Sequence, residues 1–94
     1  MRLIGKPLLD DFAVRHADVR ASLAAWASEV GEAQWHSPSD IKARYPTASI
    51  LSENRVVFNI KGNKYRLETK INYELGVVLV VRVGTHSEYS RWMF

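Results

Sequence analysis

Residues 55–83 alternate between apolar and polar side chains with a period of two, which is typical of β-strands and constrains this chain more than any other feature. The alternation breaks at Gly62-Asn63, a dipeptide suited to a tight hairpin turn, and again at residues 73–76. The pattern therefore predicts three consecutive strands that pair in antiparallel fashion.

The first turn sets the register of the first two strands, because the turn decides which residues face one another. With Gly62-Asn63 as the turn, Ile60 faces Tyr65 and Asn59 faces Arg66. One face of this hairpin is then apolar. The opposite, polar face is expected to carry the following residues: Asn59, Lys61, Lys64, Arg66 and Glu68.

For the second hairpin we expect Asn72 to face Gly76, which places Arg82 directly opposite Arg66. Like charges opposed on a sheet are destabilising by up to about 1 kcal/mol, so a bound anion between them would be stabilising. The alternative is that Glu68, one diagonal away, neutralises one arginine. The same register turns four residues toward the apolar face: Val77, Leu79, Val81 and Val83. It leaves two residues for the C-terminal Trp92-Met93-Phe94 to cover, namely Val78 and Val80.

The first half of the chain predicts helices. Residues 1–4 suggest an edge strand, and Pro7–His16 suggests a helix. A second helix is expected after Asp18 as its N-cap, with Gly31 at its C-terminal end. Its apolar stripe comprises Val19, Leu23, Trp26 and Val30. We expect one α+β domain over residues 1–94, with helices packed on one face of a small twisted antiparallel sheet.

A connector over residues 34–46 separates the helices from the strands. Ser37 and Pro38 predict the start of a short helical turn, and Pro46 predicts its end. Trp35 is expected to pack against the core, with stacking on a nucleobase as the alternative.

Charge is unevenly distributed along the chain. Residues 1–54 carry six basic and seven acidic residues, whereas residues 55–94 carry seven basic and three acidic residues. A basic second half favours a polyanionic partner, although a solvated lysine surface is the simpler interpretation. The chain contains no cysteine, which excludes disulfides and thiolate metal sites, and it shows no signal peptide or membrane-spanning segment. The expected location is the cytoplasm.

The predicted polar face fits metal-independent cleavage of RNA, in which the 2′-OH is the nucleophile. Arg66 and Arg82 would stabilise the charged transition state through bidentate contacts with phosphate oxygens. Histidine is the usual proton carrier in proteins, so His86 would carry a proton, while Tyr89 would stack on a base or pass a proton. Residues expected to bind the RNA are Asn59, Lys61, Asn63 and Lys64. No metal or organic cofactor is expected, because no nucleotide-binding loop or metal-ligand spacing occurs.

Two segments, residues 57–67 and 83–89, together resemble the HigB toxins, a branch of the RelE-like superfamily of bacterial toxin–antitoxin systems. Residues 38–46 resemble the connector of that family. The resemblance implies a RelE-like, microbial-ribonuclease fold and a ribosome-dependent endoribonuclease that cuts translated mRNA without a cofactor. It also implies inhibition by a HigA-like antitoxin with a helix-turn-helix DNA-binding domain.

The resemblance also implies roles for individual residues. Arg66 resembles the transition-state arginine of the superfamily, Tyr89 its C-terminal aromatic residue, and His86 a feature of the HigB branch. Lys61 and Lys64 flank the turn, whereas RelE-type enzymes often place two lysines on the preceding strand, so a catalytic role for them stays open. Two other functions remain possible for the same face: a non-catalytic RNA- or ribosome-binding module, and a surface that docks an acidic helix of a partner protein.

Overall fold

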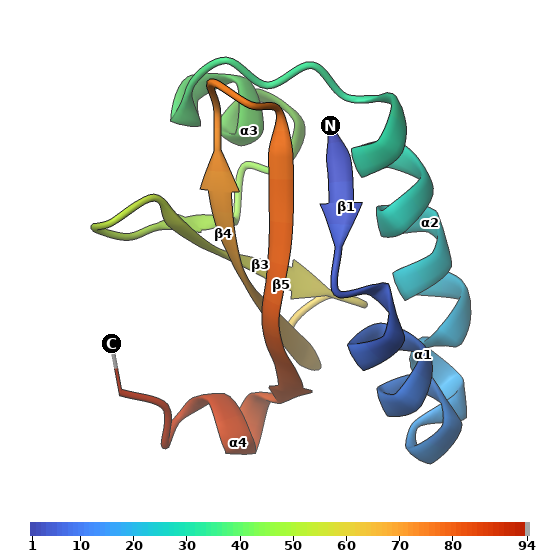
Figure 1. Ribbon diagram of the computed structural model, residues 1–94. Coiled ribbons are helices and arrows are strands. Elements are labelled where there is room, and N and C mark those ends of the chain that lie inside the picture. The colour runs from blue at the N-terminus through green and yellow to red at the C-terminus, as the bar shows by residue number, and fades with distance from the viewer. Residues whose placement is uncertain (94) are drawn as a thin grey trace.

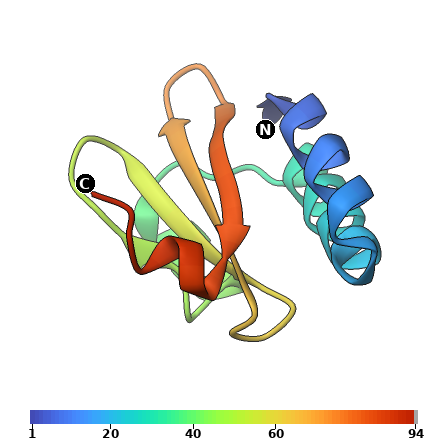
Figure 2. The ribbon, with the colours of Figure 1, turned by 90° about the horizontal axis from the view of Figure 1, so that it is seen from below.

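The computed structural model describes residues 1–93 and shows an α+β fold, as expected. In chain order the elements are β1 (Arg2–Ile4), α1 (Lys6–Arg15), a 3₁₀ turn η1 (Ala17–Val19), α2 (Arg20–Glu32), α3 (Pro38–Arg44), β2 (Ser49–Ile50), β3 (Arg55–Ile60), β4 (Tyr65–Asn72), β5 (Val77–Thr85) and α4 (His86–Tyr89). Helices α1 and α2 lie together on one side of the strands, whereas α4 and the C-terminal segment lie away from them (Figures 1 and 2).

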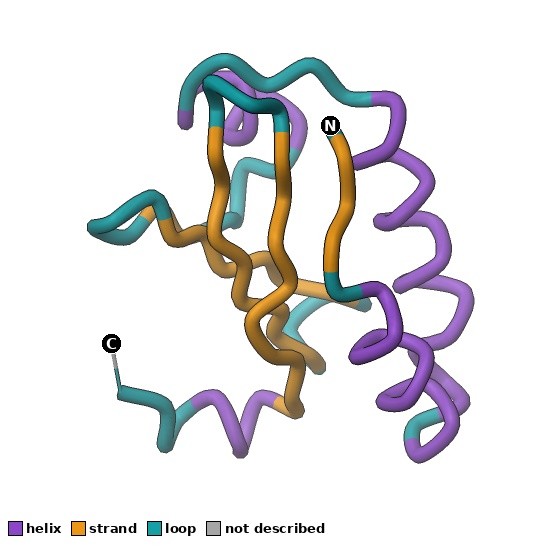
Figure 3. The backbone as a smooth tube through the Cα atoms, viewed as in Figure 1, coloured by secondary structure: helices purple, strands orange, loops and turns teal. Residues whose placement is uncertain are grey.

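The sheet has the strand order β1-β5-β4-β3-β2. Its strands are drawn in orange in Figure 3. Strands β2 to β5 are antiparallel neighbours, but β1 runs parallel to β5. The expectation of a purely antiparallel sheet is therefore wrong at one edge. The reason is that α1 and the rest of the first half of the chain separate β1 from its partner, and such a long connection allows parallel pairing.

The core lies between the sheet and the helices α1 and α2. Phe12 from α1 and Trp26 from α2 are buried with Phe58 and Leu67 of the sheet, and the Trp26 ring meets Phe58 edge to face. Trp35 stacks on Phe58, with ring centroids 6.0 Å apart. The packing roles predicted for Trp26 and Trp35 are confirmed.

Two predicted helix ends are wrong. Asp18 does not cap α2, because its carboxylate instead accepts hydrogen bonds from Lys61, Lys64 and Tyr65 at the tip of the β3–β4 hairpin. Gly31 does not end α2, which continues to Glu32, and its backbone is not left-handed. The predicted turn at residues 37–38 is confirmed, since α3 begins at Pro38.

The register of the β3–β4 hairpin is confirmed: Asn59 faces Arg66, and Ile60 faces Tyr65. The turn itself is longer than expected, because pairing ends at these last two residues. Its left-handed residues are Lys61 and Gly62, with φ angles of 53° and 66°. Asn63 keeps a negative φ. The contacts of its side chain are described below.

The predicted register of the β4–β5 hairpin is wrong. Asn72 faces Val77, because the turn contains four residues, with Gly76 left-handed and the Asn72 side chain accepting from the backbone N–H of Leu75. A β-bulge next to Glu68 then shifts the pairing again, so that Glu68 faces Arg82 and Arg66 faces Gly84. The two arginines are not opposite one another.

This register reverses part of the predicted face assignment. Val78 and Val80 are buried in the core, whereas Leu79 and Val81 are 40% and 41% exposed. The extra residue in the bulge returns Val83 to the core side. The C-terminal segment consequently does not cover Val78 and Val80, and Phe94, which belonged to that prediction, lies outside the described residues.

Candidate functional site

The sheet face opposite α1 and α2 is here called the outer face. Strand alternation and the observed register assign the following residues to it: Arg55, Val57, Asn59, Arg66, Glu68, Lys70, Leu79 and Arg82. Arg66 and Arg82 therefore share a face, as predicted, but lie two residues apart along the sheet rather than side by side.

Arg66 is the most constrained cation of the outer face. It is only 7% exposed, and its guanidinium donates to the carbonyl oxygen of Asn63 at 2.9 Å, to Asn63 Oδ1 at 3.0 Å and to the carbonyl oxygen of Tyr65 at 3.3 Å. All of these acceptors are neutral, and no carboxylate within residues 1–93 forms an ion pair with Arg66. Arg66 is therefore a fixed positive charge whose guanidinium has five donors, not all of them engaged.

Tyr89 lies against Arg66. The Arg66 guanidinium carbon is 5.2 Å from the centre of the Tyr89 ring, a cation–π contact. The short helix α4 holds Tyr89 there, and α4 begins with a capping box in which the Thr85 side chain accepts from the Glu88 N–H and the Glu88 side chain accepts from the Thr85 N–H. These hydrogen bonds hold the pKa of the Glu88 carboxyl below its usual value.

His86 is the first residue of α4 and is exposed. Its backbone N–H donates to the carbonyl oxygen of Lys64, which ties the start of α4 to the β3–β4 turn. Residues three positions apart lie on the same side of a helical turn, so His86 and Tyr89 share one side of α4. The structure thus brings three predicted catalytic residues, Arg66, His86 and Tyr89, to the same end of the sheet.

Arg82, the fourth predicted catalytic residue, has a different environment. Its Nε donates to Glu68 Oε1 at 2.5 Å, and Glu68 is 4% exposed. Arg82 also donates to the Met93 carbonyl oxygen at 3.3 Å, and its guanidinium carbon lies 4.4 Å from the Trp92 ring centre. The structure thus joins Arg82 to a carboxylate and to the C-terminal segment, and its catalytic role stays a prediction.

Trp92 links the two arginine contacts. Its ring meets that of Tyr89 edge to face, with centroids 5.5 Å apart. Gly84, opposite Arg66, makes room for it: a Cβ atom at Gly84 would lie 2.8 Å from Trp92 Cζ2. The C-terminal segment therefore closes over the outer face between Arg66 and Arg82.

The two lysines of the hairpin tip have a common acidic partner. Lys61 Nζ and Lys64 Nζ lie 3.4 Å and 2.8 Å from Asp18 Oδ2, and the Tyr65 hydroxyl donates to Asp18 Oδ1 at 2.7 Å. The bonds from Lys64 and Tyr65 hold the pKa of Asp18 far below its usual value, and the same carboxylate raises the pKa of Lys64 and of Tyr65. These lysines do not join the cations of the outer face as predicted, and their RNA-binding role stays a prediction.

Two other predicted RNA-binding residues make intramolecular contacts. Asn59 donates to the carbonyl oxygen of Thr47 at 3.3 Å, and Asn63 accepts from Arg66. Sequence reasoning missed Arg55 and Lys70, which face each other on the outer face. The signal was present, because the confirmed register of the first hairpin leads to this pair when it is continued two residues past Val57 and Glu68.

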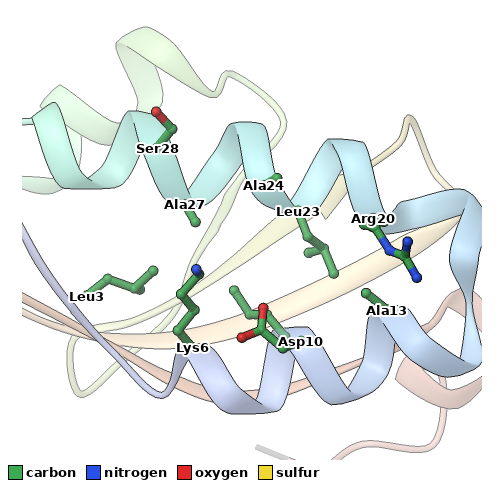
Figure 4. A pocket seen from close by; sticks show the side chains of 10 residues that line it. Leu3, Lys6, Asp10, Ala13, Arg20, Leu23, Ala24, Ala27 and Ser28 are labelled. Atoms are coloured by element: carbon green, nitrogen blue, oxygen red, sulfur yellow. The ribbon is translucent and has the colours of Figure 1, made fainter.

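Within residues 1–93, no group of three or more His, Cys, Asp or Glu side chains could hold a metal ion, and no helix could cross a membrane. A cavity of about 430 Å³ lies between α1 and α2, where Lys6, Asp10 and Arg20 surround a largely apolar floor (Figure 4). It shares no residue with the Arg66 site, so substitutions of its charged residues serve as matched controls for substitutions of charged residues on the outer face.

A family model described as HigB_toxin, a RelE-like toxic component of a toxin-antitoxin system, matches residues 19–92. The chain belongs to this HigB toxin family. The predicted resemblance is thereby confirmed, and so is the expectation of a RelE-like fold. As the toxic component of a toxin–antitoxin system, a HigB toxin acts together with an antitoxin partner.

Individual relatives agree with this assignment. The chain is 26% identical over 92 residues to the mRNA interferase toxin HigB of Escherichia coli strain K12. It has the same identity to the mRNA interferase HigB of Shigella flexneri, and each alignment covers 96% of this chain and 88% of the relative. This HigB-family chain therefore spans nearly the whole length of those relatives.

Proposed function

We propose that this protein is an mRNA-cleaving endoribonuclease, the toxin of a type II toxin–antitoxin system, and that the Arg66 end of the outer face is its active site. The observation that carries the site assignment is the buried guanidinium of Arg66, which is held by neutral acceptors and lies against Tyr89. Family membership and the mRNA interferase relatives support the activity.

The chemistry follows from what each group offers. The 2′-OH of the RNA attacks the adjacent phosphorus, so the nucleophile comes from the substrate, and the reaction needs no metal ion. Arg66 stabilises the negative charge that develops on the phosphate oxygens, and its fixed position avoids reorganisation during the reaction. Tyr89 stacks on the base next to the scissile bond, and His86 exchanges a proton with the 2′-OH or the leaving 5′-oxygen.

Arg82 would act on the same phosphate only if the substrate displaced part of the C-terminal segment, since it now contacts Glu68 and Trp92. We assign it the role of holding that segment, with a secondary electrostatic contribution to catalysis. Lys61 and Lys64 contribute positive potential at the entrance of the site, and Asn59 lies across from Arg66 where a flanking nucleotide would pass.

The proposed cellular setting follows from the family. The toxin works in the cytoplasm on mRNA that is being translated by the ribosome. A HigA-like antitoxin with a helix-turn-helix domain keeps it inactive. These points rest on the family resemblance and on the relatives. Expressing the antitoxin gene separately from the toxin gene tests them.

A purified translation mixture tests the proposal, with cut sites mapped by primer extension. Arg66→Ala should lower the cleavage rate about 10²- to 10³-fold, the loss typical of removing one transition-state donor. Arg66→Lys should recover little, because an ammonium group cannot reproduce the bidentate fork. Arg20→Ala, at the exposed first residue of α2, is the matched control and should cut like the unaltered protein.

Two results would contradict this proposal. Cleavage by Arg66→Ala at the unaltered rate would remove Arg66 from the active site. Binding of mRNA or ribosomes without any cleavage by the unaltered protein would favour the alternative of a non-catalytic RNA-binding module.

A further inference from the structure

Two cations face each other at the end of the outer face that is distant from Arg66. Arg55 on β3 and Lys70 on β4 are direct cross-strand partners. Like charges in this arrangement repel each other, and Glu68, which shares the outer face, is bonded to Arg82. Arg55 is oriented by hydrogen bonds to the Ser52 carbonyl oxygen and hydroxyl, and Lys70 is exposed. The two side chains therefore bring two cationic groups together on this part of the outer face.

A hollow of about 500 Å³ adjoins this pair. Its lining combines Lys70 with the amide side chains of Asn54 and Asn72 and the half-exposed apolar side chain of Leu79. Glu74 also contributes to the lining. Amide groups hydrogen-bond the edges of unpaired bases, and apolar side chains pack on base faces, so this composition fits a nucleobase beside a phosphate.

The hollow lies at the other end of β4 from the proposed active site, and the C-terminal segment lies over the outer face between them at Arg82. An RNA strand that reaches both ends would displace part of this segment. Lys70 lies four residues from Arg66 on the same face, a separation of about 13 Å at the usual rise of a strand. About four stacked nucleotides cover this distance at 3.4 Å each, and fewer do so when the strand is extended. Val81, between the two ends, is exposed and presents apolar surface.

We propose that Arg55, Lys70 and the adjoining hollow form a second RNA subsite, which binds a phosphate and base of the same strand two to four nucleotides from the cleaved bond. This inference rests on the proposed function and extends it. The subsite binds RNA through charge, so it contributes affinity and substrate position rather than chemistry. RNA too short to span both ends of the outer face would not use it.

The test measures binding of 2′-O-methyl oligonucleotides, which resist cleavage, by fluorescence anisotropy. Lys70→Gln keeps most of the side chain and removes the charge. It should weaken binding of a hexanucleotide several-fold while leaving a dinucleotide unchanged. The binding constant of the hexanucleotide should also depend less steeply on salt: the magnitude of the slope of log binding constant against log salt concentration should decrease by about 0.7, the value for one phosphate contact on a single strand. Lys6→Gln, beside the α1–α2 cavity, loses the same charge and should change neither.

Arg66→Ala separates the failure of this inference from the failure of the proposed function. It should weaken both oligonucleotides. If Arg66→Ala does so but Lys70→Gln behaves like Lys6→Gln, the second subsite is wrong and the active-site assignment stands. If Arg66→Ala affects neither oligonucleotide, both proposals are overturned. If Lys70→Gln weakens binding of the antitoxin and leaves RNA binding intact, the pair is a protein-docking surface and the RNA subsite is wrong.

Discussion

Asn63 accepts two hydrogen bonds from Arg66, one at its carbonyl oxygen and one at its side-chain oxygen, at 2.9 Å and 3.0 Å. The residue that was expected to bind RNA therefore holds the arginine that is proposed to stabilise the transition state. The β3–β4 turn, in which Lys61 and Gly62 have left-handed backbone, thus fixes the direction of the guanidinium.

Replacing Asn63 tests this positioning role. Asn63→Ala removes the side-chain bond and keeps the backbone bond, so the guanidinium should lose part of its orientation. A hydrogen bond to a charged group is worth about 1.5–3 kcal/mol, which corresponds to a loss in kcat of roughly 10- to 100-fold, with a smaller change in KM. Asn63→Asp keeps the acceptor, but its carboxylate would neutralise Arg66 and should also weaken RNA binding. Equal kinetics for Asn63→Ala and the unaltered protein would contradict the role.

The close approach of Gly84 and Trp92 predicts a specific steric effect. Gly84→Ala would place a Cβ atom 2.8 Å from Trp92 Cζ2, and Glu88 Cβ would be 3.3 Å away. We expect the C-terminal segment to shift and the free energy of unfolding to fall by about 1–3 kcal/mol, the usual cost of overpacking. Tryptophan fluorescence and urea unfolding measure the two effects.

The matched comparison uses a second substitution. In a Trp92→Ala background the main clash is absent, so Gly84→Ala should cost clearly less stability there than in the unaltered protein. Equal costs in the two backgrounds would show that the segment does not pack on Gly84 in solution.

The parts of the fold that could be predicted are those fixed by local rules. The Gly62-Asn63 turn and strict alternation set the β3–β4 register, and helical spacing placed Trp26 in the core. The β4–β5 register failed first at its turn, which contains four residues rather than three, and then at a bulge that shifts every later pairing and that nothing local in a run of valines marks. Asp18 failed as a cap because its partners are more than forty residues away in sequence.

The site divides in the same way. Arg66 could be singled out because it follows the Gly62-Asn63 turn, and His86 and Tyr89 because they follow Thr85, which caps the short helix α4. The pairing of Arg82 with Glu68 depends on the bulge, so sequence reasoning weighed it only as an alternative. Arg55 and Lys70 were within reach of the correct register and were missed because the pairing was not extended to them.

Glu68 gives a prediction in which stability and RNA binding change in opposite directions. Its carboxylate is buried and accepts from Arg82. Glu68→Gln removes the charge, so the fold should lose about 1–3 kcal/mol of unfolding free energy. RNA should bind more tightly at low salt, because the outer face loses an acidic group among its cations. Thermal unfolding and anisotropy measure both changes, and weaker RNA binding by a folded Glu68→Gln protein would argue against the outer face as the RNA surface.

Asp18 predicts an acid-sensitive attachment of the hairpin tip. Hydrogen bonds from Lys64 and Tyr65 lower the pKa of its carboxyl in the folded protein from the usual 3.8. A group with a lowered folded pKa stabilises the fold above its unfolded pKa, and this contribution is lost as the pH falls below that value. Stability should therefore decrease as the pH is lowered from about 4, and Asp18→Asn should flatten this part of the profile. Asp10→Asn, at an exposed position of α1, is the control for loss of one carboxylate and should leave the acid limb unchanged.

The same contact makes an opposite prediction in alkali. Asp18 raises the pKa of Lys64 above its usual 10.5, so the contribution of Lys64 is present below that pH and is lost as the pH rises through the raised value.

Urea unfolding between pH 2 and pH 5 compares the acid limbs of the unaltered protein, Asp18→Asn and Asp10→Asn. Because Lys61 and Lys64 lie on either side of Asn63 in the turn that holds Arg66, the same Asp18→Asn protein should also cut RNA more slowly at neutral pH. A parallel acid limb for Asp18→Asn and the unaltered protein would show that the carboxylate does not hold the tip in solution.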